Sequence, residues 1–219
     1  MIHLIDISKS YPTRHGLKVV LPRTRLTIPS HLRVGVIGAN GSGKTSLLRM
    51  ISGVEEPDTG YVVRDCRTSW PLGLANSVHP EQTGYENIAF ISRLYGADVE
   101  EIRFFVEDFS ELGRDLESPV KTYSSGMKGK LAFGLALALD FDVYLVDEMT
   151  SVGDKNFRQK AKRAFQERAT KNGLLFVSHN DKSVEDMCDV ALVLSRAKIY
   201  LFDDVKEATK FYSDVVMAG

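Results

Sequence analysis

Apolar residues along this chain fall into short runs that alternate with segments of helical period. The runs have the length of buried strands, whereas in the other segments apolar positions recur every three or four residues, as on one face of a helix. Glycine, proline and aspartate separate them and indicate turns. The pattern predicts strands at 2–7, 17–21, 26–28, 34–37, 61–63, 68–70, 143–146, 174–177, 190–194 and 198–202. It predicts helices from about 45 to 53, at 85–95, 99–112, 124–138 and 157–171, in a short segment after 179, and near 205–213.

The order of these elements predicts an α/β fold. After residue 34 strands and helices alternate, which favours a core sheet covered by helices. The strands before residue 34 have no helix between them and are expected to be antiparallel, with residues 8–12 ending the first one. We expect a single domain over 1–219. In it, 1–70 and 119–219 form the core with an N-terminal antiparallel β-subdomain, and 71–118 form a loop and an inserted α-helical subdomain.

Composition narrows the class of protein. The chain has 219 residues, 26% of them charged, a net charge of −1 and no block of like charge, which argues against a nucleic-acid-binding protein that relies on a basic face. The N-terminus lacks the basic start of a signal peptide, Asp6 interrupts it, and no window approaches the ~20 apolar residues of a membrane span. Cys66 and Cys188 lie far apart without metal-ligand spacing, so we expect reduced thiols in a cytosolic protein.

The strand at 34–37 leads into the most specific motif of the chain. Two glycines five positions apart precede Lys44 and Thr45, which is the pattern of a phosphate-binding loop rather than the G-x-G-x-x-G of a dinucleotide fold. Glycines let backbone N–H groups point inward at a polyphosphate, and the helix that follows adds its positive end. Lys44 would bind the β- and γ-phosphates and assist catalysis, and the Thr45 hydroxyl would bind Mg²⁺. The predicted nucleotide-binding residues are Gly38, Ala39, Asn40, Gly41, Ser42, Gly43, Lys44, Thr45 and Ser46.

Two further strands end in polar residues that fit the same chemistry. Asp147 and Glu148 follow the buried strand at 143–146, at the edge of an α/β sheet where ligands bind. Asp147 fits the role of holding Mg²⁺ through water, and Glu148 that of the base that activates the attacking water. His179 follows the strand at 174–177 and could donate a hydrogen bond to the γ-phosphate. The simpler alternatives are an acidic turn and an ordinary surface histidine.

A second anion-binding feature lies well after the first. Ser124, Ser125 and Gly126 stand at the predicted N-terminus of a helix, where N–H groups attract anions. The simpler interpretation is a plain N-cap. If both features bind phosphate, either one chain holds one ATP with both, or two copies face head to tail and each completes the other's site.

The order of these motifs resembles that of the ATP-binding cassette (ABC) ATPases. Nearly the whole chain is covered by Gly38–Thr45, Ser124–Gly126, Val143–Glu148, Ser151–Asp154 and Ser178–His179. The resemblance implies a phosphate-loop NTPase core that binds ATP and Mg²⁺, with Tyr11 stacked on adenine. It implies a homodimer in which Ser124 and Gly126 contact the γ-phosphate of ATP held by the opposite subunit, and in which Asp154 lies in the loop that links the two sites. It also implies that the helical segment 85–118 meets a membrane partner.

The chain also resembles, more narrowly, the ATP-binding component of bacterial capsular polysaccharide exporters. This resemblance rests on the short C-terminus without a carbohydrate-binding domain and on Ser69–Leu74, Thr122–Met127, Phe133–Gly134, Val146–Glu148 and Val152–Asp154. It implies an ATPase at the cytoplasmic face of the bacterial inner membrane. That ATPase powers capsular polysaccharide export with a separate integral membrane permease and binds no nucleic acid.

Three positions depart from the family pattern. Where the family has the signature Leu-Ser-Gly-Gly-Gln, this chain has Tyr-Ser-Ser-Gly-Met at 123–127. Where the family has a proline after the catalytic glutamate, this chain has Met149. His79 stands where the family has a glutamine that serves Mg²⁺ and the attacking water, with Gln82 three residues later. Neutral histidine can ligate a metal, although Mg²⁺ prefers oxygen. We expect His79 to be the equivalent residue and a metal ligand, with Gln82 as the alternative.

Other functions stay open at this stage. A soluble ABC ATPase that acts on nucleic acid or ribosomes generally carries two cassettes or long insertions, which this chain lacks. An exporter of another cell-surface glycan would share every motif. A phosphate-loop kinase needs an acceptor pocket and gives no reason for Ser124–Gly126.

Overall fold

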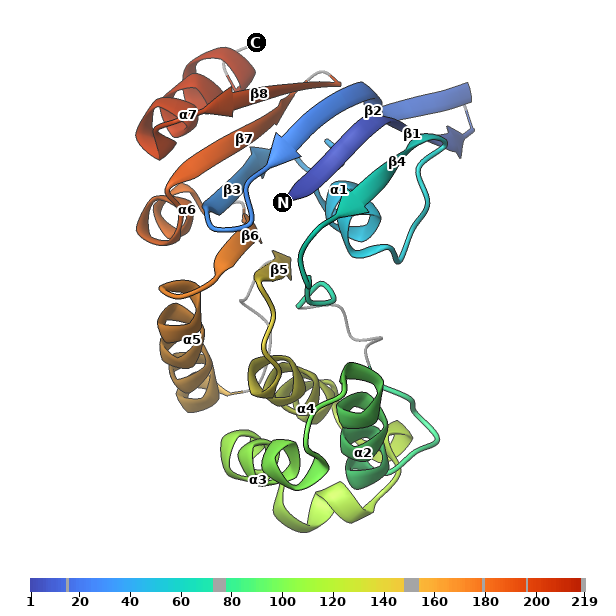
Figure 1. The fold of residues 1–219 in the computed structure, drawn as a ribbon. Helices are drawn as coiled ribbons and strands as arrows, with labels where there is room; N and C mark the ends of the chain where they lie inside the picture. Colours follow the sequence, from blue (N-terminus) through green and yellow to red (C-terminus); the bar gives the residue numbers. More distant parts are fainter. Residues whose placement is uncertain (15, 73–77, 148–153, 179, 196, 218–219) are drawn as a thin grey trace. The chain divides into compact units, whose positions relative to one another are not determined.

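The computed structural model describes residues 1–14, 16–72, 78–147, 154–178, 180–195 and 197–217, and Figure 1 shows its fold. The chain divides into two compact units. The sheet unit comprises Met1–Pro71, Phe141–Glu148 and Ala169–Gly219, and the helical unit comprises Leu72–Asp140 and Met149–Arg168.

The centre of the sheet unit is a five-stranded sheet, which confirms the predicted α/β class. Its strands are β3 (Arg33–Gly38), β5 (Val143–Asp147), β6 (Gly173–Val177), β7 (Val190–Ser195) and β8 (Lys198–Phe202). They lie in the order β5-β6-β3-β7-β8, with the first four parallel and β8 antiparallel to β7. β3 and β6 are buried along almost their whole length, which explains their continuous apolar runs.

The second sheet of this unit is antiparallel, as predicted, but its strands are longer. β1 (Ile2–Thr13) lies between β2 (Gly16–Ile28) and β4 (Thr59–Arg64). The expected break at residues 8–12 and the expected division of 17–28 into two strands are therefore wrong. The physical reason is that prolines are tolerated where a strand has a partner on one side only: Pro12 lies beyond Ser8, the last β1 residue paired with β4, and Pro22 lies on the edge strand β2. The β1–β2 register also shifts three times between Leu4 and Ser10.

Helix α1 (Lys44–Ser52) joins the two sheets in one apolar core. Its buried residues Leu47, Leu48, Met50 and Ile51 belong to a cluster with side chains from β1, β3, β5, β6 and β7. Gly53 ends the helix in the left-handed conformation, as glycine does at many helix C-termini. The C-terminal part of the unit adds α6 (Asp181–Met187), α7 (Val205–Phe211) and a π-helical turn at Tyr212–Met217.

Residues 68–70 do not form the predicted strand. Thr68 makes an isolated parallel bridge to Val143, and the Ser69 N–H donates to the Val143 carbonyl at 3.0 Å. The Ser69 hydroxyl then accepts a hydrogen bond from the Leu145 N–H at 2.9 Å. A side-chain oxygen therefore replaces the backbone carbonyl that would accept this N–H if the strand continued.

The helical unit contains α2 (Gly84–Tyr95), α3 (Val99–Ser110), the 3₁₀ turns η1 (Gly113–Glu117) and η2 (Val120–Thr122), α4 (Ser125–Ala138) and α5 (Lys155–Ala169). It is larger than the 71–118 segment expected from the sequence, because α4 and most of α5 fold with it. Phe109 of α3 is the centre of its core, with ring contacts to Phe105, Phe133 and Phe157. Among the residues described, no helix combines the length and the apolar character required to cross a membrane.

Gly35 allows α6 to pack closely on the central strand β3. A Cβ added at Gly35 would overlap Val184 Cγ1 and would lie 3.4 Å from the Cys188 sulfur, both of which are buried. Burial raises the pKa of the Cys188 thiol to about 12, so this thiol stays protonated. Cys66 and Cys188 are both free cysteines, as predicted.

We expect Gly35→Ala to lower the free energy of unfolding by about 1–3 kcal/mol, because the added methyl group overpacks this contact. Urea unfolding followed by circular dichroism measures the change. Gly134→Ala in α4 is the matched control, because its Cβ would meet Phe109 at an ordinary 3.6 Å and alanine favours a helix. The control should be neutral or stabilising by up to about 1 kcal/mol. Equal destabilisation by both substitutions would contradict the packing account.

Candidate nucleotide-binding site

The loop between β3 and α1 has a backbone that only glycine fits at three positions. Gly41 and Gly43 adopt φ angles of 75° and 102°, in the region that L side chains rarely adopt. A Cβ at Gly43 would lie 2.8 Å from the Val20 carbonyl oxygen, and one at Gly38 would lie 2.5 Å from that of Leu194. The predicted glycine loop therefore forms, and its last glycine directly precedes α1.

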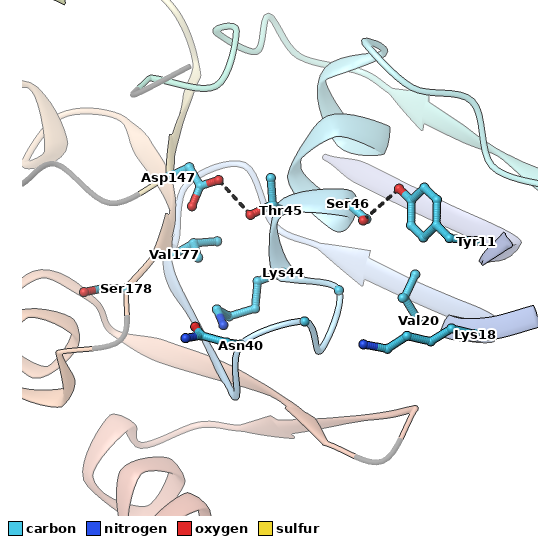
Figure 2. Close-up of a pocket in the computed structure, with 12 residues that line it drawn as sticks. Tyr11, Lys18, Val20, Asn40, Lys44, Thr45, Ser46, Asp147, Val177 and Ser178 are labelled. Atoms are coloured by element: carbon cyan, nitrogen blue, oxygen red, sulfur yellow. Dashed lines mark hydrogen bonds between the residues drawn. The ribbon is translucent and has the colours of Figure 1, made fainter. Parts of the chain in front are cut away.

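Lys44 and Thr45 open α1 and point to different partners. The Lys44 ammonium donates to the carbonyl oxygens of Gly38 and Ala39, at 2.6 and 3.0 Å, and so lies over the start of the loop. The Thr45 hydroxyl donates to Asp147 Oδ2 at 2.8 Å, which brings together two residues that are 102 positions apart. Figure 2 shows Thr45 and Asp147 facing each other across the end of β5.

This pair of oxygens fits a magnesium ion. Mg²⁺ is usually bound by one or two protein oxygens and completes its coordination with water and substrate phosphates. A hydroxyl and a carboxylate 2.8 Å apart beside a phosphate loop supply such a pair. Within the described residues, no group of three or more histidine, cysteine, aspartate or glutamate side chains forms an alternative metal site.

Tyr11 is fixed to the same helix by its hydroxyl group. It donates to Glu55 Oε1 at 2.6 Å and lies 2.9 Å from the Ser46 hydroxyl. Lys9 pairs with the same Glu55 carboxylate at 3.1 Å. Burial, followed by the hydrogen bond to Glu55, raises the pKa of Tyr11, so the phenol stays neutral. The ring is thereby held at a defined position beside the phosphate loop.

These residues line one cavity of about 370 Å³, within the size range of small-molecule sites. Its lining includes six predicted positions of the phosphate loop and α1, together with Tyr11 and Asp147. It also includes residues that the sequence interpretation missed, namely Lys18, Val20, Val177 and Ser178. Val177 and Ser178 adjoin the predicted His179 and could have been found from that strand. Lys18 and Val20 depend on the pairing of β1 with β2, which the sequence did not reveal. Figure 2 shows these side chains around the cavity.

The predicted second anion site lies in the helical unit. Ser124 is the N-cap of α4, and its exposed hydroxyl oxygen accepts from the Met127 N–H at 3.2 Å; Ser125 and Gly126 follow in the first turn. Asp154 caps α5 by accepting from the N–H groups of Asn156 and Phe157. The Phe157 hydrogen bond is the main cause of a lowered Asp154 pKa.

His79 also belongs to the helical unit, where Asn87 holds its backbone. The His79 N–H donates to Asn87 Oδ1 at 2.7 Å, and Asn87 Nδ2 donates to the carbonyls of His79 and Thr83 at 3.1 and 2.9 Å. The exposed His79 ring accepts the Glu81 N–H at Nδ1, 3.3 Å away. A neutral ring that accepts at Nδ1 carries its proton on Nε2. The Oε1 atom of Gln82 is buried and makes no hydrogen bond with the described residues.

Two predicted catalytic residues, Glu148 and His179, lie outside the described residues. Their neighbours are described: Asp147 ends β5 beside Thr45, and Ser178 lines the cavity. The roles of Glu148 and His179 therefore stay predictions.

Comparison with known proteins agrees with this geometry. The family described as ABC transporter matches residues 21–151. An ATP-binding cassette solved as a dimer in a post-hydrolysis state, bound to ADP and Pi, has the same fold: its TM-score is 0.77 at 19% identity, covering 94% of this chain and 99% of that one.

Full-length relatives are considerably more similar in sequence. The capsule polysaccharide export ATP-binding protein CtrD of Neisseria meningitidis is 41% identical, covering 98% of this chain and 100% of its own. The polysialic acid transport ATP-binding protein KpsT of Escherichia coli is 42% identical, with 98% and 99% covered, and the ATP-binding protein BexA of Haemophilus influenzae is 39% identical, with the same shares covered. The chain therefore belongs to the ABC transporter family and is one of its ATP-binding proteins, as the order of its motifs predicted.

Proposed function

We propose that this chain is the ATP-hydrolysing subunit of a capsular polysaccharide exporter, acting with a separate permease at the cytoplasmic face of the bacterial inner membrane. The observation that carries the ATPase is the Thr45–Asp147 hydrogen bond beside the glycine loop and Lys44. The cargo is supported by relatives of almost equal length whose names state capsule polysaccharide export and polysialic acid transport.

The cavity residues divide the work of binding ATP. Lys44, released from the loop carbonyls, neutralises the β- and γ-phosphates, and the glycine loop offers its N–H groups. Thr45 and Asp147 would hold Mg²⁺, which when bound would supply positive charge to the phosphates. Glu148, the residue after β5, takes a proton from the attacking water, and His179, two residues after β6, donates to the γ-phosphate.

The second half of the site comes from another copy of the chain. Ser124 and Ser125 are exposed at the start of α4, where helix N–H groups favour an anion. In the proposed homodimer Ser124 and Gly126 contact the γ-phosphate of ATP held by the partner, and Asp154 lies in the segment between the two sites. ATP then joins the two copies, and hydrolysis separates them.

His79 acts toward this site as a hydrogen-bond donor in our proposal. Its Nδ1 already accepts the Glu81 N–H, so the neutral ring offers an Nε2–H rather than a lone pair. An Nε2–H suits a phosphate or water oxygen, whereas metal ligation, which the sequence suggested, requires the other tautomer.

The first test of the proposed function replaces the predicted base. Glu148→Gln should bind ATP, lose on the order of 10²–10⁴ in turnover, and accumulate as an ATP-bound dimer, because the amide cannot take the proton of water. Phosphate release and analytical ultracentrifugation measure the two effects. In a capsulated bacterium that lacks its own exporter ATPase, the unchanged chain should restore surface capsule and the variant should not. Near-normal turnover of the variant would remove Glu148 from its role, and failure of the unchanged chain to restore surface capsule would contradict the export function.

A pair of substitutions at Ser124 separates an N-cap from a nucleotide contact. Ser124→Ala removes the cap and should cost about 1 kcal/mol of unfolding free energy, whereas Ser124→Asp retains a capping oxygen and should cost much less. Both should lose ATP hydrolysis, and Ser124→Asp should lose it more completely, because its carboxylate repels the γ-phosphate. If activity instead follows stability in the two variants, Ser124 is only a cap.

The role of His79 can be tested with Mn²⁺ in place of Mg²⁺. In the ATP-loaded protein we expect pulsed EPR to show the same nitrogen couplings to Mn²⁺ before and after the His79→Gln substitution. The reason is that Nε2 carries a proton and therefore does not bind the metal. His79→Gln should retain hydrolysis within about tenfold, since its amide can still donate, and His79→Ala should lose more. A nitrogen coupling that His79→Gln abolishes would establish metal ligation instead.

A further inference from the structure

Lys18 shares the nucleotide cavity with the phosphate loop, although it lies on a different sheet. It pairs directly with Tyr11 in the β1–β2 register, so the two side chains extend from the same face of the antiparallel sheet. The Lys18 ammonium comes within 3.0 Å of the position that a Cβ on Gly41 would occupy. Figure 2 shows the side chain reaching from β2 toward the loop that carries Asn40 and Lys44.

The charges that line this cavity favour an anion. Among the described residues they are the two ammonium groups of Lys18 and Lys44 and the carboxylate of Asp147. Thr45 donates to the Asp147 carboxylate, and Lys44 lies against two loop carbonyls. Lys18 forms no ion pair with a carboxylate anywhere in the described part of the chain. By contrast, Lys9 on the neighbouring strand β1 pairs with Glu55 and Asp58. An ammonium group that has no carboxylate partner and lies beside a phosphate loop can donate a charge-assisted hydrogen bond to a phosphate oxygen.

We infer that Lys18 is a second phosphate-binding cation, additional to Lys44, and that it contacts the α- or β-phosphate of the bound nucleotide. This inference rests on the proposed binding of ATP in this cavity. Tyr11 marks the base end of the site, and the Thr45–Asp147 pair marks the opposite end, where these two residues would hold Mg²⁺. Lys18 stands beside Tyr11 in the sheet and extends to Gly41, which places it between these two ends, on the Tyr11 and Val20 side in Figure 2.

The experiment measures the affinity of Lys18→Met and Lys18→Arg for ATP and ADP, by titration calorimetry at two salt concentrations. Lys18→Met should weaken both nucleotides equally, by roughly three- to tenfold, because the α- and β-phosphates are common to both. The loss should shrink at high salt, and Lys18→Arg should bind within about twofold of the unchanged protein. Lys198→Met is the matched control, an exposed strand lysine of the same unit that does not line the cavity, and it should change neither affinity.

The outcomes separate this inference from the proposed function. The inference is overturned if Lys18→Met binds both nucleotides as tightly as the control, or if only its affinity for ATP falls. Either result leaves the proposed ATP binding intact. An unchanged protein that binds neither nucleotide overturns the proposed function itself. Thermal unfolding without nucleotide should give the same midpoint for all variants, because Lys18 is exposed.

Discussion

The hydrogen bond from the Thr45 hydroxyl to Asp147 is the contact on which the site depends. It joins the first turn of α1 to the carboxyl end of β5, and so connects the phosphate loop with the strand that precedes the predicted catalytic base. Both atoms are oxygens of the kind that Mg²⁺ prefers. If β5 were shifted by one residue along the sheet, the loop could still bind phosphate. The metal and the predicted base would then no longer lie beside the bound phosphate.

The parallel sheet makes this meeting possible because its strands end at one edge. Gly38 ends β3, Asp147 ends β5 and Val177 ends β6, although these residues are far apart in the sequence. The carboxyl edge of such a sheet is where α/β proteins bind ligands. The antiparallel sheet adds a second wall, in which Tyr11, Lys18 and Val20 face the loop. The cavity thus has a wall from each sheet of one unit, and both sheets share a single apolar core with α1.

The sequence predicted the parts of this site that depend on local chemistry. The glycine loop, Lys44, Thr45 and Asp147 follow from a strand–loop–helix pattern and from an acid at the end of a buried strand, and the structure brings them together. Lys18 and the bonds of Tyr11 to Ser46 and Glu55 were not predicted, because they depend on the register of β1 and β2. That register shifts between Leu4 and Ser10 in a way that no alternation of apolar residues encodes. Residues 8–12 continue β1 rather than ending it, because Pro12 lies where β1 pairs with β2 alone, which the sequence does not reveal. The hydrogen bond from the Glu81 N–H to the His79 ring was also beyond the sequence, because it depends on the local turn of the backbone.

The sheet unit carries the phosphate loop, and the helical unit carries the exposed Ser124 at the start of α4. In the proposed homodimer, the phosphate loop of one copy meets Ser124 of the other copy. The most direct measurement is an experimental structure of the protein with ATP and Mg²⁺ bound. We predict a dimer in which each nucleotide lies between Gly38–Thr45 of one copy and Ser124 of the other. A closed dimer whose nucleotides are remote from Ser124, or a monomer that encloses ATP by itself, would contradict the account.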